Sequence, residues 1–172
     1  MNKEIISKFE GTLNEFISIL SSFSQEQFNR HPQENSCTAG QVAEHIRKSL
    51  KRGVVLLTDN TKPADRSADQ MMETIKNIFS DFSRKLNSPD FIIPADMYYN
   101  KDILLHELSK AKEIGTIAKT LDLSELCMAF AFPVLGHLTR LEIIYFYTYH
   151  IKRHIHQLKR IAEKLQQRIS VK

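Results

Sequence analysis

Two histidines near the end of the chain have a spacing that suits metal binding. His150 and His154 lie four residues apart in the run YHIKRHIHQ, so on a helix they share one face about one turn apart. A turn rises about 5.4 Å, which lets two imidazoles reach one ion through metal–nitrogen bonds of about 2.0–2.1 Å. His45 lies beside the apolar Val42 and Ile46 on a separate segment and is a candidate to face the same cavity. A bound metal and a core network of hydrogen-bonded imidazoles both remain open.

The residues around the histidine pair predict that it points into a core. Ile143 and Ile161 bracket it on the same helix face, and Tyr147 lies between them. The hydroxyl of Tyr147 could meet a ligand or a core acceptor. His156 is two residues from His154, so we expect it on the opposite, solvent-facing side of the helix.

Other polar residues near these segments have weaker claims to a chemical role. Glu44 and Glu142 are expected to be salt-bridged surface carboxylates rather than general bases. His137 precedes the last helix and suits a capping or solvent role, or a place at the mouth of a pocket. Cys37 is expected to be buried, although a position at a helix N-terminus would favour its thiolate. No catalytic acid or base can be named from the sequence.

Five segments carry apolar residues at helical spacing and must position these side chains. They cover about residues 3–22, 38–59, 67–86, 101–121 and 138–167. The first places an apolar stripe three or four residues apart: Ile5, Phe9, Leu13, Phe16 and Leu20. The sequence therefore predicts an all-α protein without a substantial sheet.

The segments that join these helices contain their own signals. Thr38 and Gln41 form the pattern of a capping box at the start of the second helix. Prolines exclude helix from 60–66 and 88–100, and Pro133 and Gly136 predict an irregular course for 122–137. No repeat and no long linker divides the chain, so residues 1–172 are predicted to form one domain.

Composition narrows the class of protein. The 172 residues are 42% hydrophobic and 26% charged, with two cysteines and a formal net charge of +4. The first residues carry scattered charges and lack the apolar run expected of a secretory signal. No stretch reaches about 20 apolar residues, and the two cysteines do not form a Cys-x-x-Cys pair. Basic residues concentrate between 152 and 168, but no nucleic-acid-binding motif accompanies them. We expect a cytoplasmic protein that binds neither membrane nor nucleic acid.

Two stretches together resemble one family. The run TAGQVAEHIRKS and the later run GHLTRLEIIYFYTYHIKRHIHQL are similar to the DinB-like family, also called DinB/YfiT-like metalloenzymes. The resemblance implies a four-helix bundle of unusual connectivity, here with an additional helical segment and long connections. It also implies that His45, His150 and His154 bind a divalent metal, zinc or nickel.

The same resemblance extends to the surroundings of the metal. Gln157 matches the family's glutamine after the histidine pair, where it would support a ligand from the second shell. Tyr147 and Gln41, the latter one turn before His45, are further candidates to line the pocket. Cys37 stands where many members have tryptophan. Because metal binding requires neutral imidazole, occupancy is expected to fall as the pH drops through about 6.

Three imidazoles leave coordination positions open, which is typical of catalytic sites. The resemblance implies a metal-dependent hydrolase or a thiol S-transferase of the bacillithiol type, acting on a small molecule that could itself be a low-molecular-weight thiol. The alternative is a non-catalytic bundle whose metal is structural or vestigial and which acts as a dimerising binding module. Relatives often pair, so we expect a homodimer.

Overall fold

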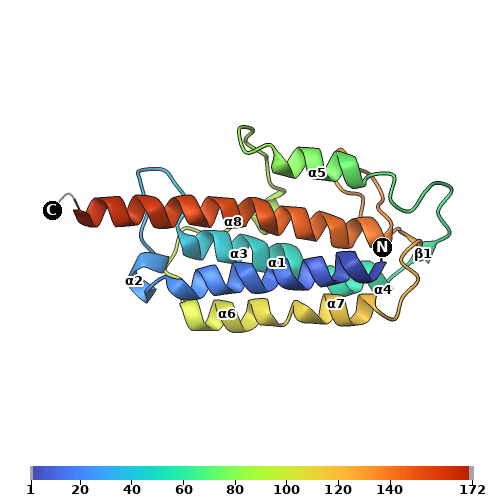
Figure 1. The fold of residues 1–172 in the computed structure, drawn as a ribbon, viewed down its shortest axis with the longest axis horizontal. Helices are drawn as coiled ribbons and strands as arrows, with labels where there is room; N and C mark the ends of the chain where they lie inside the picture. The colour runs from blue at the N-terminus through green and yellow to red at the C-terminus, as the bar shows by residue number, and fades with distance from the viewer. Residues whose placement is uncertain (1, 171–172) are drawn as a thin grey trace.

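Four helical rods run side by side in the structure, a computed structural model that describes residues 2–170 and the side chains of residues 2–167 (Figure 1). The rods are α1 (Asn2–Ser22), α3 (Ala39–Leu50) continued by α4 (Gly53–Thr58), α6 (Lys101–Ser109) continued by α7 (Lys112–Ala118), and α8 (Arg140–Ser170). Each rod packs on two others, because α1 contacts α8, α6 and α7 while α3 contacts α6 and α8. The predicted all-α four-helix bundle is confirmed.

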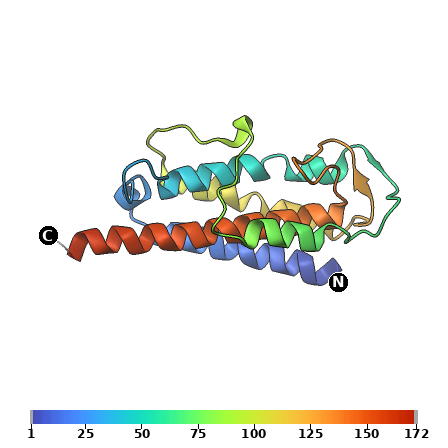
Figure 2. The same ribbon diagram turned by 90° about the horizontal axis from the view of Figure 1, so that it is seen from above.

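The order of the rods gives the bundle its unusual connectivity. Helices α1 and α8 lie side by side and run in the same direction, opposite to α3 and α6 (Figures 1 and 2). The chain must therefore cross back over the length of the bundle between α4 and α6. Helix α5 (Met72–Ser80) lies on this return path and packs on the outside of α8. This is the additional helical segment that was predicted.

Short elements complete the connections. Helix α2 (Gln25–Phe28) and the 3-10 helix η1 (Asp90–Ile92) were not predicted. Strands β1 (Thr61–Lys62) and β2 (Leu126–Cys127) pair antiparallel, with Thr61 opposite Cys127. This two-residue ladder joins the expected irregular segment 122–137 to the connection after α4.

None of the helices that the structure describes is long and apolar enough to cross a membrane.

One continuous hydrophobic core fills the bundle. The predicted stripe of α1 is buried throughout, from Ile5 at 5% exposure to Leu20 at 0%. Helix α8 contributes the longest buried face, with Ile143, Tyr147 and Ile161 all inside. Since burial of each large apolar side chain stabilises a fold by about 1.5–3 kcal/mol, these two faces hold α1 and α8 together along their length.

Three predicted helices are shorter or interrupted. The segment 38–59 breaks at 51–52. The segment 101–121 breaks at 110–111, where the backbone hydrogen bonds tighten to i→i+3 spacing. Helix α5 ends at Ser80, because the carboxylate of Asp81 accepts bonds from the backbone and hydroxyl of Ser83 and turns the chain. Phe82 and Leu86 therefore lie outside the helix that was expected to hold them.

Candidate metal centre

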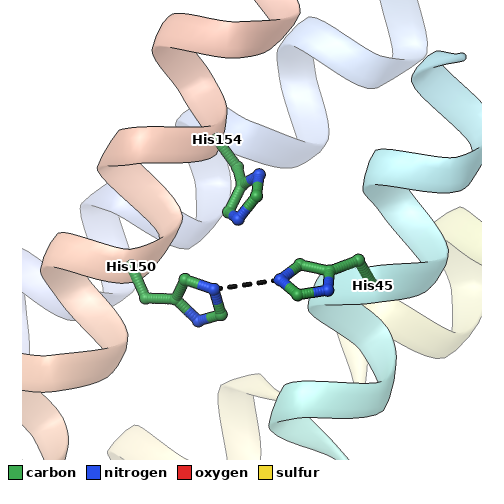
Figure 3. A group of neighbouring side chains, drawn as sticks. All are labelled: His45, His150 and His154. Carbon is green, nitrogen blue, oxygen red and sulfur yellow. Dashed lines mark hydrogen bonds between the residues drawn. The ribbon is translucent and has the colours of Figure 1, made fainter. Parts of the chain in front are cut away.

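Three imidazole rings converge between α3 and α8 (Figure 3). His45 projects from α3, and His150 and His154 project from successive turns of α8. One ring nitrogen from each lies within 4.8 Å of the others, and Nε2 of His45 is 3.1 Å from Nε2 of His150. Two nitrogens that share one ion lie up to about 4 Å apart, so the cluster is close to the geometry of a common site.

Local sequence explains why these rings meet. The four-residue spacing places His150 and His154 on the inward face of α8, as predicted, and α3 packs directly against that helix. The capping box that starts α3 is present, since Thr38 and Gln41 exchange side chain–backbone bonds of 3.1 and 2.9 Å. This cap sets the beginning of α3 and with it the phase at which His45 faces the bundle.

A second group engages the Nδ1 atom of each ring. Nδ1 of His45 lies 3.1 Å from the carbonyl of Ile92, and Nδ1 of His154 lies 2.8 Å from Oε1 of Gln157. Nδ1 of His150 lies 3.4 Å from the Ser49 hydroxyl. Carbonyl and amide oxygens only accept, so His45 and His154 donate from Nδ1 and keep an unprotonated Nε2. This is the ring orientation that metal-binding histidines use.

The rings are held in the neutral form that metals require. Burial lowers the pKa of His45 and holds the pKa of His150 well below its usual value, with repulsion from the neighbouring histidines adding to the latter. Burial and the nearby His45 lower the pKa of His154 to about 3. Proton competition in the folded protein therefore begins at a lower pH than the value of about 6 expected from the sequence. The donor set fits a divalent metal ion, because neutral imidazoles are common ligands for such ions.

A large cavity opens onto the cluster. Its volume is about 1,020 Å³, and the three histidines belong to its lining together with Tyr147 and Gln157. Such a volume holds a ligand the size of a typical metabolite. The hydroxyl of Tyr147 donates to the carbonyl of Ser49 at 3.3 Å. Of the two partners considered for this hydroxyl, a ligand or a core acceptor, the structure shows the core acceptor.

The structure corrects several expectations around the site. Gln41 is not among the described residues that line the cavity, because its side chain caps α3 and contacts Asp96. His156 is half-buried and lines the cavity, stacked on Phe82 with ring centroids 4.0 Å apart. Cys37 is exposed rather than buried, and desolvation raises the pKa of its thiol, so thiolate is not favoured.

The two carboxylates expected on the surface are also placed differently. Glu142 is fully buried and accepts from Arg66 at 2.6 and 2.7 Å and from the backbone of Met71 and Thr139. It ties the connection before α5 to the start of α8. Glu44 is 8% exposed and pairs with Arg47 at 2.7 Å. Neither lines the cavity in the described part of the chain.

The remaining histidines lie away from the centre. Nδ1 of His137 lies 3.2 Å from the carbonyl of Cys127, and Nδ1 of His31 lies 2.6 Å from the carbonyl of Ser36 in its loop. His106 is exposed on α6. Sequence reasoning missed the support from Ser49 and Ile92. Ser49 carries a usable signal, since it lies one turn after His45, whereas a backbone carbonyl on a distant loop carries none.

Comparison with known proteins agrees with this architecture. Residues 8–158 match the DinB superfamily. The uncharacterised protein YuaE of Bacillus subtilis is 26% identical over 148 residues, which are 86% of this chain and 90% of that protein. The structure of YfiT from Bacillus subtilis, described as a probable metal-dependent hydrolase with an unusual four-helix bundle topology, aligns with a TM-score of 0.61 at 17% identity. The alignment covers 96% of this chain and 87% of YfiT. With its match extending from the first half of α1 into the second half of α8, the chain belongs to the DinB superfamily.

Proposed function

We propose that this protein is a metal-dependent enzyme that binds a zinc or nickel ion through His45, His150 and His154 and acts on a small molecule in the adjacent cavity. The observation that carries the proposal is the convergence of three neutral imidazoles, each oriented through its other nitrogen, on the wall of a cavity of about 1,020 Å³. A purely structural network would not need the cavity.

The protein's own residues would hold and orient the reactants. When bound, the ion would act as a Lewis acid and lower the pKa of a coordinated thiol or water. Ser49, Gln157 and the Ile92 carbonyl fix the three rings. Aromatic side chains on the cavity walls, among them Phe79 and Phe146, would exclude water from the reacting groups.

The lining favours thiol transfer over hydrolysis. No Asp or Glu is among the described residues that line the cavity, so no carboxylate is placed to take a proton from water. A thiol loses its proton more readily without a general base, since its pKa is about 8.5 against 15.7 for water. We therefore take transfer of a low-molecular-weight thiol of the bacillithiol type as the leading reaction. Hydrolysis remains the second candidate because YfiT, the structural relative, is described as a probable hydrolase.

The test combines metal content with turnover. Wild type, His150→Ala and the control His156→Ala would be loaded identically with zinc or nickel, desalted and analysed for metal by mass spectrometry. We expect near-equimolar metal in wild type and the control and a large loss in His150→Ala. Conjugation of bacillithiol to 1-chloro-2,4-dinitrobenzene would measure transfer, and p-nitrophenyl acetate would measure hydrolysis. Equal metal in wild type and His150→Ala would show that the cluster is only a hydrogen-bonded network.

A non-catalytic binding module is the rival, and the lack of an evident acid or base supports it. That rival predicts full metal occupancy without turnover of either substrate. It also predicts a stable homodimer, which light scattering would show as a species of about twice 19.9 kDa.

A further inference from the structure

The cavity beside the histidine cluster is lined by an excess of positive charge. Helix α3 contributes Lys48, the residue before α4 is Arg52, and the loop after α5 contributes Arg84 and Lys85. Helix α8 adds three more: Arg153, Arg160 and Lys164. Among the described lining residues no carboxylate faces these seven cations. Elsewhere in this chain acidic and basic residues are interleaved, so the cavity departs from the rest of the surface.

These cations are not neutralised by neighbouring residues. In the part of the chain that the structure describes, none of the seven forms an ion pair within 4.0 Å, whereas seven other Lys and Arg side chains do. Arg153 donates to the backbone carbonyls of Asp81 and Arg84, and Lys48 donates to the carbonyl of Ile93 at 2.8 Å. Such bonds orient the side chains and leave their charge uncompensated.

The carboxylate of Asp81 lies near two of these cations. Hydrogen bonds from Ser83, together with the nearby Arg84 and Arg153, lower the pKa of Asp81. Its oxygen accepts from the Ser83 backbone and hydroxyl, and Asp81 is not among the described lining residues. The Asp81 carboxylate is therefore bonded within its own loop, and the seven cations of the lining outnumber it.

The same cavity is also apolar. Phe79, Phe130, Phe132 and Phe146 form linked aromatic contacts on its wall, with centroid distances of 4.7–5.2 Å between successive rings. Large apolar side chains remain exposed around the lining, with exposures of 45% at Phe82, 62% at Phe91 and 94% at Val134. Apolar walls beside a group of fixed charges are the arrangement of a pocket for a ligand that has both characters.

We propose that the substrate is an amphipathic organic anion, whose carboxylate, phosphate or sulfonate meets the cationic residues while its apolar part lies on the aromatic wall. The inference deepens the proposed function, because it assigns a substrate class to the same cavity, but the cationic lining does not depend on a metal. Fixed unpaired charges in a low-dielectric cleft concentrate anions and orient them before reaction.

A matched pair of fluorescent probes tests this directly. 8-Anilinonaphthalene-1-sulfonate and N-phenyl-1-naphthylamine share the same ring system and differ in the sulfonate. Titration of each into the folded protein, with and without bound zinc, should show that the sulfonate binds about tenfold more tightly or better, with an affinity that falls as salt is added. Equal affinities of the two probes would overturn the proposal.

Paired variants locate the effect. Arg84→Gln with Lys85→Gln removes two charges from the cavity lining, and Lys62→Gln with Lys112→Gln removes two exposed charges outside the lining that the structure describes. The first pair should lose most of the preference for the sulfonate without weakening the neutral probe, while the second should behave as wild type. Equal losses in both pairs would show a general charge effect and refute the site. If the protein prefers the sulfonate probe but cannot be loaded with zinc, the proposed metal site fails and the anion-binding cavity stands. If the protein binds zinc but does not prefer the sulfonate probe, the anion-binding cavity fails and the proposed metal site stands.

Discussion

At the scale of single residues, the hydrogen-bond partners of the histidine Nδ1 atoms influence how tightly the three rings bind a metal ion. Gln157 accepts from Nδ1 of His154 at 2.8 Å and thereby aims the opposite nitrogen at the cluster. Replacing it by Leu removes the acceptor and leaves a buried ring nitrogen without a partner. We expect Gln157→Leu to weaken zinc binding by about 10–100-fold, measured by competition with a chelating dye.

Two variants separate this effect from a loss of packing. Gln157→Glu keeps an acceptor oxygen in the same place and should bind zinc at least as tightly as wild type. Gln70→Leu makes the same change at an exposed position and should leave affinity unaltered. Weak binding in both Gln157 variants would indicate that the hydrogen bond is not the cause.

The lowered histidine pKa values predict how the metal-free protein responds to acid. The pKa of His154 is about 3 in the folded state and about 6.5 in the unfolded chain, so the unfolded chain takes up the proton first. The stabilising contribution is complete above pH 6.5 and is lost as the pH falls toward 3. Between pH 7 and pH 4.5, protonation of this ring in the unfolded chain should lower the free energy of unfolding by about 2 kcal/mol.

Urea unfolding at the two pH values, in the presence of a chelator, measures that cost. His154→Gln should show a smaller loss on acidification than wild type, and His106→Gln, at an exposed position on α6, should show the full wild-type loss. A wild-type loss in His154→Gln would mean that the ring titrates normally.

At the scale of elements, one close approach sets how α4 lies on α7. A Cβ built on Gly53 would fall 2.3 Å from Cδ1 and 2.9 Å from Cγ1 of Ile114, and Ile114 is 1% exposed with little room to move. We expect Gly53→Ala to lower the free energy of unfolding by about 1–3 kcal/mol through overpacking. Urea denaturation would measure the change.

The same substitution in open space should act in the opposite direction. A Cβ on Gly11 of α1 would meet nothing within 4 Å. Gly11→Ala should therefore stabilise the protein by about 0.5–1 kcal/mol through helix propensity. Similar losses in both variants would contradict the packing argument at Gly53.

The sequence predicts the limits of a helix well where a continuous apolar face along that helix is enough to define them. Helices α1 and α8 begin and end within a few residues of the predicted limits, since their apolar faces are long and uninterrupted. The end of α5 at Ser80 was not predicted, although the turn between Asp81 and Ser83 that ends it is local in sequence. Two further contacts cannot be read from the sequence, because Arg153 of α8 holds the carbonyl of Asp81 and Phe82 stacks on His156 instead of continuing the stripe.

At the scale of the whole molecule, the site depends on the unusual connectivity. His45 and His150 are 105 residues apart in the chain, and their meeting requires the return path that places α3 against α8. Periodicity could put His150 and His154 on one inward face, but only the family resemblance brought His45 opposite them. The burial of Glu142 escaped prediction for a related reason, since its partner Arg66 comes from that return path.

A metal held between α3 and α8 should stabilise the entire bundle. An ion that binds the folded state and not the unfolded chain adds about 2.7 kcal/mol at 100 times its Kd and about 4.1 kcal/mol at 1,000 times. Wild-type protein should therefore melt at a higher temperature with zinc than with chelator, by calorimetry at equal protein concentration. His45→Ala removes the ligand that α3 supplies, and His150→Ala removes one of the two that α8 supplies. Both should lose most of this shift, whereas His156→Ala, which keeps all three ligands, should retain it. A shift of wild-type size in His45→Ala would mean that zinc binds through α8 alone, and the two helices would then not be joined by the ion.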